Sequence, residues 1–266
     1  MPIPNTWKNP VRETLESGKP VVGATITTAS VEAAAQAAQL GFDFLWIEME
    51  HSPITLETLR NIVLATRGLA AVPFARVPVV ETWTAKRVLD MGAMGVIFPF
   101  ASTPDLALTA ANACKYPPAG NRGYGPGLAT FRWQADEGYA DFADRNVMVV
   151  AMIEEQRAVE RIDEIAATPG IDVLFIGTSD LSFSMGLRGR QDEPALERAL
   201  DKVVNAARKH GKFAGRPAIQ NASIPKFIEQ GFQFIQAPSE LRLMAEGAKP
   251  ILDLLGKTGV TNRAMY

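Results

Sequence analysis

The chain has 266 residues, of which 47% are hydrophobic and 21% are charged, so it has the composition of a folded protein with a large core. Its 27 basic and 29 acidic side chains give a net charge of −2, which argues against nucleic acid or an anionic membrane as the main partner, because both attract basic surfaces. With one cysteine and two histidines, it can form no intramolecular disulfide, cysteine zinc cluster or three-histidine metal site.

The start of the chain, MPIPNTWKNPVRETLESGKP, carries charges and prolines where a secretory signal would have an apolar run. No apolar stretch approaches the roughly 18 residues that span a bilayer. A reducing compartment fits a chain with a single cysteine. These features predict a cytoplasmic protein with no membrane partner.

Short apolar runs rich in β-branched residues alternate with helical patterns along the chain. Each run is predicted as a strand and each following segment as a helix, several of them with a capping residue before or a glycine after. The predicted strands are residues 21–27, 44–49, 72–77, 96–100, 147–153, 173–176, 213–215 and 234–237. The predicted helices are residues 31–40, 55–66, 82–91, 103–114, 157–167, 193–210, 224–230 and 240–255, with a short helical turn at 181–185.

The alternation is interrupted once, between the fourth helix and the fifth strand. Residues 115–127, KYPPAGNRGYGPG, are too rich in proline and glycine for a regular element and are predicted as a loop. Residues 128–144 are polar with interspersed aromatic residues and are predicted to contain helix.

Eight strand–helix units without a dividing linker predict one domain, residues 1–266, folded as a (β/α)8 barrel. An open doubly wound sheet is the alternative, because the pattern alone does not show closure. Barrel active sites lie at the carboxyl ends of the strands. The residues predicted there are mostly ionisable: Glu48, Glu50, His51, Arg76, Pro99, Glu154, Gly177, Asp180 and Arg216.

Glu154 and Asp180 follow two consecutive predicted strands, so their carboxylates are expected to converge. Two carboxylates with open positions suit a hard divalent cation such as Mg²⁺ or Mn²⁺ that also binds a substrate with oxygen donors. The alternative is structural, with each acid favouring the start of a helix. The lysines considered, Lys86, Lys115, Lys202 and Lys212, do not fall at the reactive ends of strands, which favours a metal over a Schiff base.

Glu48 and Glu50 alternate onto the same side of the second strand, and His51 follows directly. A carboxylate beside an imidazole suits a general base near neutral pH, whereas the alternative is a loop histidine bonded to a neighbour. Arg76 ends the next strand. It is predicted either to bind a carboxylate or developing oxyanion, or to form a structural salt bridge with Glu48 or Glu50.

Taken together, these segments resemble the class II pyruvate aldolases of the hydroxy-ketoacid (HpcH/HpaI) aldolase family, from about residue 23 to 255. The matching segments, in order, are FDFLWIEMEHSP, PFARVP, LDMGAMGVIFPF, KYPPAGNRGYG, MIEE and PGIDVLFIGTSDLS. The resemblance implies an aldolase that reversibly cleaves 4-hydroxy-2-oxo acids to pyruvate and an aldehyde through a pyruvate enolate. It also implies a homohexamer, a trimer of dimers, in which the last helix is exchanged between barrels.

The resemblance further assigns roles to single residues. It implies Mg²⁺, Mn²⁺ or Co²⁺ on Glu154 and Asp180, and Arg76 beside the enolate oxygen. It pairs His51 with Glu48 for proton transfer and places backbone N–H groups near Ser179 and Asp180 at the pyruvate carboxylate. Asp90 matches a position that often reaches the site of a neighbouring subunit.

The chain departs from the family pattern at Glu48, where aspartate is usual, and at Met49, Met152, Thr178-Ser179 and Arg216-Pro217. These departures bear on the proton relay and the aldehyde more than on pyruvate enolisation. Two alternative functions stay open. One is a CoA-thioester lyase on a related barrel, against which the lack of a basic cluster for nucleotide phosphates counts. The other is a non-catalytic barrel that binds an oxo acid.

Overall fold

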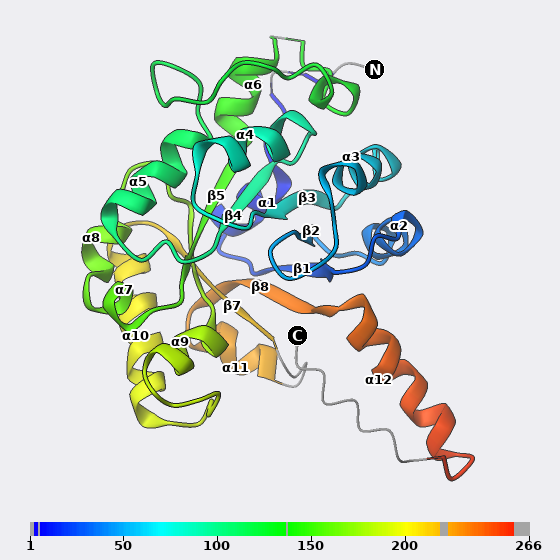
Figure 1. Ribbon diagram of the computed structural model, residues 1–266, viewed down its shortest axis with the longest axis vertical. Coiled ribbons are helices and arrows are strands. Elements are labelled where there is room, and N and C mark those ends of the chain that lie inside the picture. Colours follow the sequence, from blue (N-terminus) through cyan, green and yellow to red (C-terminus); the bar gives the residue numbers. More distant parts are fainter. Residues whose placement is uncertain (1–2, 5, 137, 219–222, 258–266) are drawn as a thin grey trace.

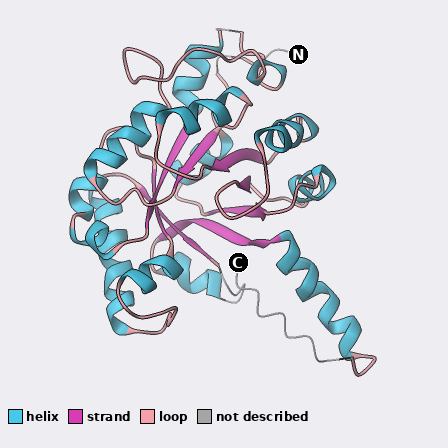
Figure 2. Cartoon of the chain, in the orientation of Figure 1, coloured by secondary structure: helices cyan, strands magenta, loops and turns pink. Residues whose placement is uncertain are grey.

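The computed structural model describes residues 3–4, 6–136, 138–218 and 223–257. Eight parallel strands close into a barrel in chain order, from β1 to β8, and β8 pairs with β1. The strands lie at the centre, and helices cover much of the outside (Figures 1 and 2). The predicted (β/α)8 barrel is therefore confirmed, and the open sheet is excluded.

The elements follow the predicted alternation with small shifts at their ends. The strands are β1 (Val21–Ile26), β2 (Phe44–Glu48), β3 (Val72–Arg76), β4 (Gly95–Phe98), β5 (Met148–Ile153), β6 (Val173–Ile176), β7 (Phe213–Pro217) and β8 (Phe232–Ser239). The helices are α1 (Pro10–Glu16), α2 (Val31–Gln39), α3 (Leu56–Ala65), α4 (Thr82–Asp90), α5 (Pro104–Ala113), the 3₁₀ helix η1 (Ala129–Phe131), α6 (Tyr139–Asn146), α7 (Gln156–Glu160), α8 (Ile162–Ala166), α9 (Thr178–Ser184), α10 (Pro194–Lys209), α11 (Ile224–Glu229) and α12 (Glu240–Asp253).

Three helices differ from expectation. Helix α1 was not predicted, although its start carries a standard signal: the Asn9 side chain accepts from the Val11 N–H, and Pro10 takes the first helical position. The helix predicted at 157–167 is two helices, because the backbone of Arg161 leaves the helical conformation. Helix α9 begins at Thr178, earlier than the predicted turn.

Aromatic side chains fill the barrel interior, and glycines on neighbouring strands make room for them. The rings of Phe44 and Phe234 stack with centroids 4.3 Å apart, and Phe74 lies 5.2 Å from Phe44. A Cβ on Gly23 would overlap the Phe44 ring, and one on Gly95 would overlap Phe74. The interior is thus a packed core rather than a pore, as in other barrels of this type.

Helix α12 leaves the barrel after β8 and projects into solvent (Figure 1). None of its residues is buried. Its first residue, Glu240, accepts the backbone N–H groups of Thr27, at 2.8 Å, and Thr28, at 2.6 Å, in the segment after β1. The start of α12 is therefore tied to the carboxyl end of the barrel.

In the described part of the chain, no helix combines the length and apolar character needed to cross a bilayer.

Candidate active site

The floor of the site is an aromatic layer that carries a carboxylate. The buried Trp46 ring lies 4.8 Å from Phe175, and its Nε1 donates to Oε2 of Glu48 at 3.2 Å. The other oxygen, Oε1, accepts the backbone N–H groups of Glu50 at 2.8 Å and His51 at 3.1 Å. The chain after β2 therefore folds around the Glu48 carboxylate, and this turn places Glu50 and His51 at the barrel mouth.

Arg76 lies opposite Glu48, because the register of β2 and β3 pairs these two residues. Its Nη1 lies 3.3 Å from Oε2 of Glu48, and its Nη2 forms an ion pair with Glu50. Arg76 is only 8% exposed, so these two carboxylates compensate a charge that would otherwise be costly to bury. Both salt bridges offered as the structural alternative for Arg76 are thus present.

Glu50 joins the arginine to the histidine. Its Oε2 lies 3.6 Å from Nε2 of His51, whose side chain is half exposed, and the same oxygen pairs with Arg76. Burial raises the pKa of Glu50, while the charges of Arg76 and His51 oppose the increase. The family resemblance assigns no role to Glu50, although its alternation with Glu48 along the strand places both carboxylates on the same side.

Glu154 occupies the position directly after β5 and is almost fully buried. Its Oε2 accepts the backbone N–H of Phe100 at 2.8 Å, whereas Oε1 is buried and has no partner among the described residues. Burial raises the pKa of Glu154 to about 7; the Phe100 N–H and Arg76 oppose this, and the negative charges of Asp180 and Glu50 add to it. The acids predicted from separate strand ends therefore share one electrostatic environment.

Gly177 provides the space that the Glu154 carboxylate occupies, since a Cβ on it would lie 2.5 Å from Oε1. Ser179 and Asp180 follow in the first turn of the seven-residue helix α9, and both are exposed. Backbone N–H groups in a first turn lack intrahelical partners, so they point outward as free donors. The unpartnered Oε1 of Glu154 is suited to bind a divalent cation, with the nearby carboxylate of Asp180 as a second ligand.

The described residues contain no group of three or more histidine, cysteine, aspartate or glutamate side chains that could hold a metal. The predicted pair, Glu154 and Asp180, stays below that number. A cation held by two carboxylates keeps its other positions for water or substrate, as catalytic metal sites with an open position do.

Asp90 is engaged within its own chain, near the predicted loop 115–127. The nearly fully buried Arg122 donates from Nη2 to Oδ1 of Asp90 at 3.0 Å and lies over the Tyr116 ring. A Cβ on Gly125 would lie 3.2 Å from Oδ2 of Asp90. The loop is therefore packed around this carboxylate, and its reach into another subunit stays a prediction.

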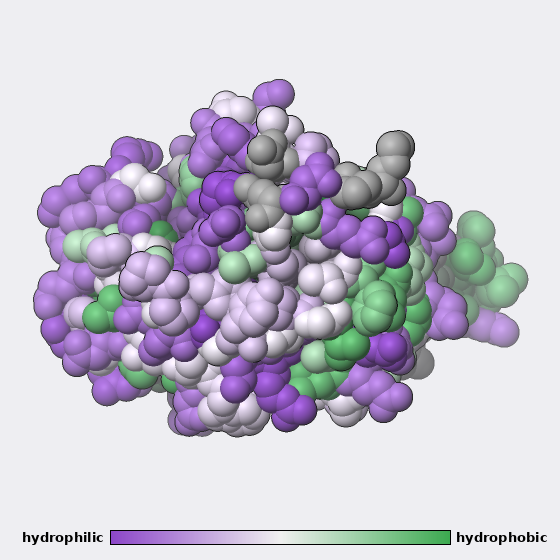
Figure 3. All heavy atoms as spheres, turned by 90° about the horizontal axis from the view of Figure 1, so that it is seen from above, coloured by the Kyte–Doolittle hydropathy of each residue, from purple (hydrophilic) through white to green (hydrophobic). Residues whose placement is uncertain are grey.

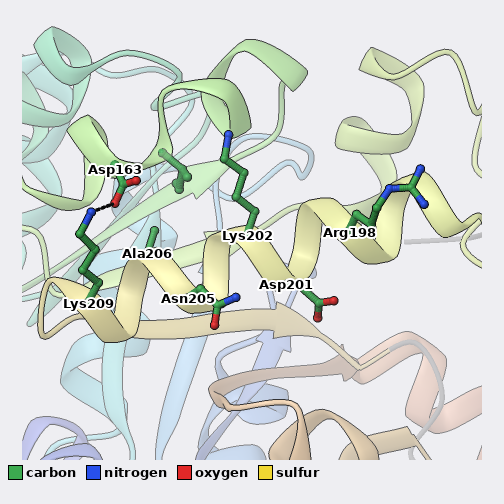
Figure 4. Close-up of a pocket in the computed structure, with 8 residues that line it drawn as sticks. Asp163, Arg198, Asp201, Lys202, Asn205, Ala206 and Lys209 are labelled. Atoms are coloured by element: carbon green, nitrogen blue, oxygen red, sulfur yellow. Dashed lines mark hydrogen bonds and ion pairs between the residues drawn. The ribbon is translucent and has the colours of Figure 1, made fainter.

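A surface hollow of about 380 Å³ lies outside the barrel between α8 and α10 (Figure 4). Among its charged side chains, Lys209 forms an ion pair with Asp163 at 2.9 Å (Figure 4). The hollow contains none of the strand-end residues described above.

A closed parallel barrel with buried ionisable side chains at its carboxyl strand ends defines a (β/α)8 enzyme. Residues 26–246 match the family described as HpcH/HpaI aldolase/citrate lyase. The hydroxypyruvate/pyruvate aldolase of Paraburkholderia phytofirmans is 32% identical over 254 residues, covering 93% of this chain and 98% of its own. The 5-keto-4-deoxy-D-glucarate aldolase of Shigella sonnei is 32% identical over 217 residues, covering 82% and 85%.

A solved structure gives the same result. The HpcH/HpaI aldolase/citrate lyase family protein from Burkholderia cenocepacia J2315 superposes with a TM-score of 0.87 at 31% identity, covering 94% of this chain and 100% of that one. The chain belongs to the HpcH/HpaI aldolase/citrate lyase family. It is an aldolase, a carbon–carbon lyase, which confirms the enzyme class expected from the sequence.

Proposed function

We propose that this aldolase reversibly cleaves 4-hydroxy-2-oxo acids to pyruvate and an aldehyde through a pyruvate enolate. The observation that carries the proposal is the buried oxygen of Glu154, which has no described partner and whose carboxylate shares its electrostatic environment with the Arg76 cation. Such a site can gather positive charge around the oxygens of an oxo acid. The pyruvate and oxo-acid aldolase names of the two relatives support the same substrate class.

Glu154 and Asp180 would hold the divalent cation, with Mg²⁺, Mn²⁺ and Co²⁺ as the candidates. When bound, the cation supplies positive charge that favours the enolate over the keto form. Of these two residues, Asp180 is exposed to solvent and Glu154 is buried.

Arg76 is the group of the chain itself that stabilises negative charge on the enolate oxygen. Glu48 and Glu50 hold its guanidinium in place before substrate arrives, so little reorganisation is needed as charge develops. The free N–H groups near Ser179 and Asp180 would accept the carboxylate of pyruvate.

His51 is assigned to proton transfer, oriented by Glu50 and by the turn around Glu48. In cleavage, a base takes the proton of the 4-hydroxyl as the C3–C4 bond breaks. The bonding electrons pass into the enolate, and the aldehyde leaves. A proton then returns to C3 to give pyruvate, so atoms and charge balance.

The assembly is proposed to be a homohexamer, a trimer of dimers, that exchanges α12 between barrels in the cytoplasm. The support is the exposed apolar surface of this helix. Figure 3 shows green, apolar side chains on the distant projection at the right, where Figure 1 places α12. Its exposed apolar residues and those just after it are Leu241, Met244, Ile251, Leu252, Leu254 and Leu255. Solvent exposure of such a surface is unfavourable, and a second copy would bury it.

Deuterium exchange into the methyl group of pyruvate tests enolisation without requiring the aldehyde. The wild-type protein is treated with a chelator and assayed with and without added Mg²⁺, Mn²⁺ or Co²⁺. Exchange should require a metal and be abolished by Glu154→Gln and Asp180→Asn, while Glu155→Gln, which changes the next carboxylate along the chain, should retain it. Metal-independent exchange would contradict the proposal. Full exchange in His51→Ala would restrict that residue to the cleavage step.

A further inference from the structure

A cavity of about 500 Å³ lies at the opposite end of the barrel from the strand-end carboxylates. Val72, the first residue of β3, lines it together with Ala70 and other residues of the turn after α3. Trp7, which precedes α1, and Trp133 supply aromatic walls, with ring centroids 5.3 Å apart. The volume is in the range of small-molecule sites.

Arg132 also lines this cavity and is 6% exposed. Its Nη1 donates to the carbonyl of Val63 at 2.7 Å and the hydroxyl of Thr66 at 2.8 Å, and its Nη2 to the carbonyl of Ala71 at 3.3 Å. These acceptors are all neutral, and Nε is buried with no described partner. A buried cation without a counter-ion is costly, so a compensating anion would be favoured here.

A second arginine adds to this positive charge. Arg67 lines the same cavity, and within the described ranges neither arginine forms an ion pair with an acidic side chain. Burial, together with the nearby charge of Arg67, lowers the pKa of Arg132 to about 10. Carbonyls at the end of α3 explain why the Nη atoms are occupied, but they leave the buried Nε without a partner, while Arg67 adds a solvent-exposed positive charge beside it.

We propose that this cavity binds a small organic anion in which a carboxylate is joined to a flat apolar group. The carboxylate faces Arg67 and Arg132, and the apolar part packs against Trp7 and Trp133. The indole nitrogen of Trp133 already donates to the carbonyl of Gly92 at 2.8 Å and Arg132 lies over its ring, so only the 6% of this residue that is exposed contacts a ligand. Such a site is separate from the aldolase chemistry at the other end of the barrel.

Calorimetric titration of the full-length protein with benzoate, benzamide and inorganic phosphate tests the proposal. Arg132 is left unchanged, because it holds the end of α3. Instead, Arg67→Gln removes one cation and Ala70→Trp fills the cavity, while Arg60→Gln, in α3 but outside the cavity lining, is the control. Circular dichroism establishes that each variant is folded.

Saturable benzoate binding is expected, weakened about tenfold by Arg67→Gln, lost in Ala70→Trp and unchanged in Arg60→Gln. Benzamide, which has the same shape without the charge, should not bind, and phosphate should bind more weakly than benzoate. The proposal is overturned if benzoate does not bind up to about 10 mM, if benzamide binds equally well, or if both cavity variants bind benzoate like the wild type. The last result would place the benzoate elsewhere, for instance at Arg76.

Discussion

Gly177 lies so close to Glu154 that a methyl group on the glycine would occupy the position of the carboxylate: the added Cβ would be 2.5 Å from Oε1 and 2.6 Å from Cγ. The backbone at Gly177 is not in the left-handed region, so conformational freedom is not the reason for a glycine here. The missing side chain instead leaves the space in which the Glu154 carboxylate lies at the end of β5.

Gly177→Ala should therefore displace the Glu154 carboxylate. Because the metal then loses its contact with Glu154, Mn²⁺ binding should weaken by about tenfold or more. Calorimetry or electron paramagnetic resonance of Mn²⁺ measures the affinity. Gly247→Ala in α12 is the matched control, because a Cβ there meets nothing within 4 Å. Equal Mn²⁺ affinity in the two variants would argue against Glu154 as a ligand.

Replacing Arg76 by lysine keeps the charge but loses the fork that spans Glu48 and Glu50. Pyruvate methyl exchange at saturating metal should fall by about 10²-fold, the order seen when one oxyanion-stabilising donor is removed. The rate is followed by proton NMR in D2O. Arg60→Lys, which changes an arginine on α3, serves as the control, and an unchanged exchange rate in Arg76→Lys would remove Arg76 from enolate stabilisation.

Burial raises the pKa of Asp43, at the start of β2, although its Oδ2 accepts the Val22 N–H at 2.7 Å. The folded chain then binds this proton more tightly than the unfolded chain. The stabilising contribution of protonated Asp43 is therefore fully present below the pKa of the unfolded chain. It is lost as the pH rises through the higher pKa of the folded chain.

Asp43→Asn removes this titration, so the stability of the variant relative to the wild type should be greater at pH 7 than at pH 4. Urea unfolding at both pH values measures the difference in the free energy of unfolding. Asp201→Asn, which changes an exposed carboxylate on α10, should show a smaller change. A pH-independent difference for Asp43→Asn would contradict the assignment.

The exposed apolar residues of α12 predict an assembly that charge should disrupt. The double variant Met244→Glu with Ile251→Glu is expected to sediment as a smaller species than the wild type in analytical ultracentrifugation. Lys249→Gln alters a polar position of the same helix and should leave the sedimentation coefficient unchanged. Identical sedimentation of all three proteins would show that this apolar surface is not an interface.

The alternation of apolar and helical segments was sufficient to predict the barrel, because strands β2 to β6 are fully buried runs and the helices between the strands have a polar side. It did not locate the division between α7 and α8, since the departure of Arg161 from helical geometry has no glycine or proline to mark it. The start of α1 carries a capping signal in Asn9 and Pro10, so this helix is recognisable from the sequence.

For the site, the sequence supplied the strand ends, the candidate acids and a salt bridge of Arg76 with Glu48 or Glu50 as one of two alternatives, but it did not choose between those alternatives. Contact between Arg76 and Glu48 depends on the register of β2 and β3, which periodicity does not determine. The role of Glu50 as the link to His51 depends on the turn that the Glu48 carboxylate organises. Contacts of this kind arise from tertiary geometry, so they become visible only when the barrel is closed.

Glu240 has two structural roles. Its carboxylate accepts the backbone N–H groups of Thr27 and Thr28 beside the barrel mouth, and its backbone begins the helix that extends away from the barrel. A neighbouring subunit that binds α12 would therefore contact a helix whose first residue also holds the backbone at the rim of the barrel mouth. If the proposed assembly forms, turnover per subunit is expected to change when the protein is diluted until its subunits separate.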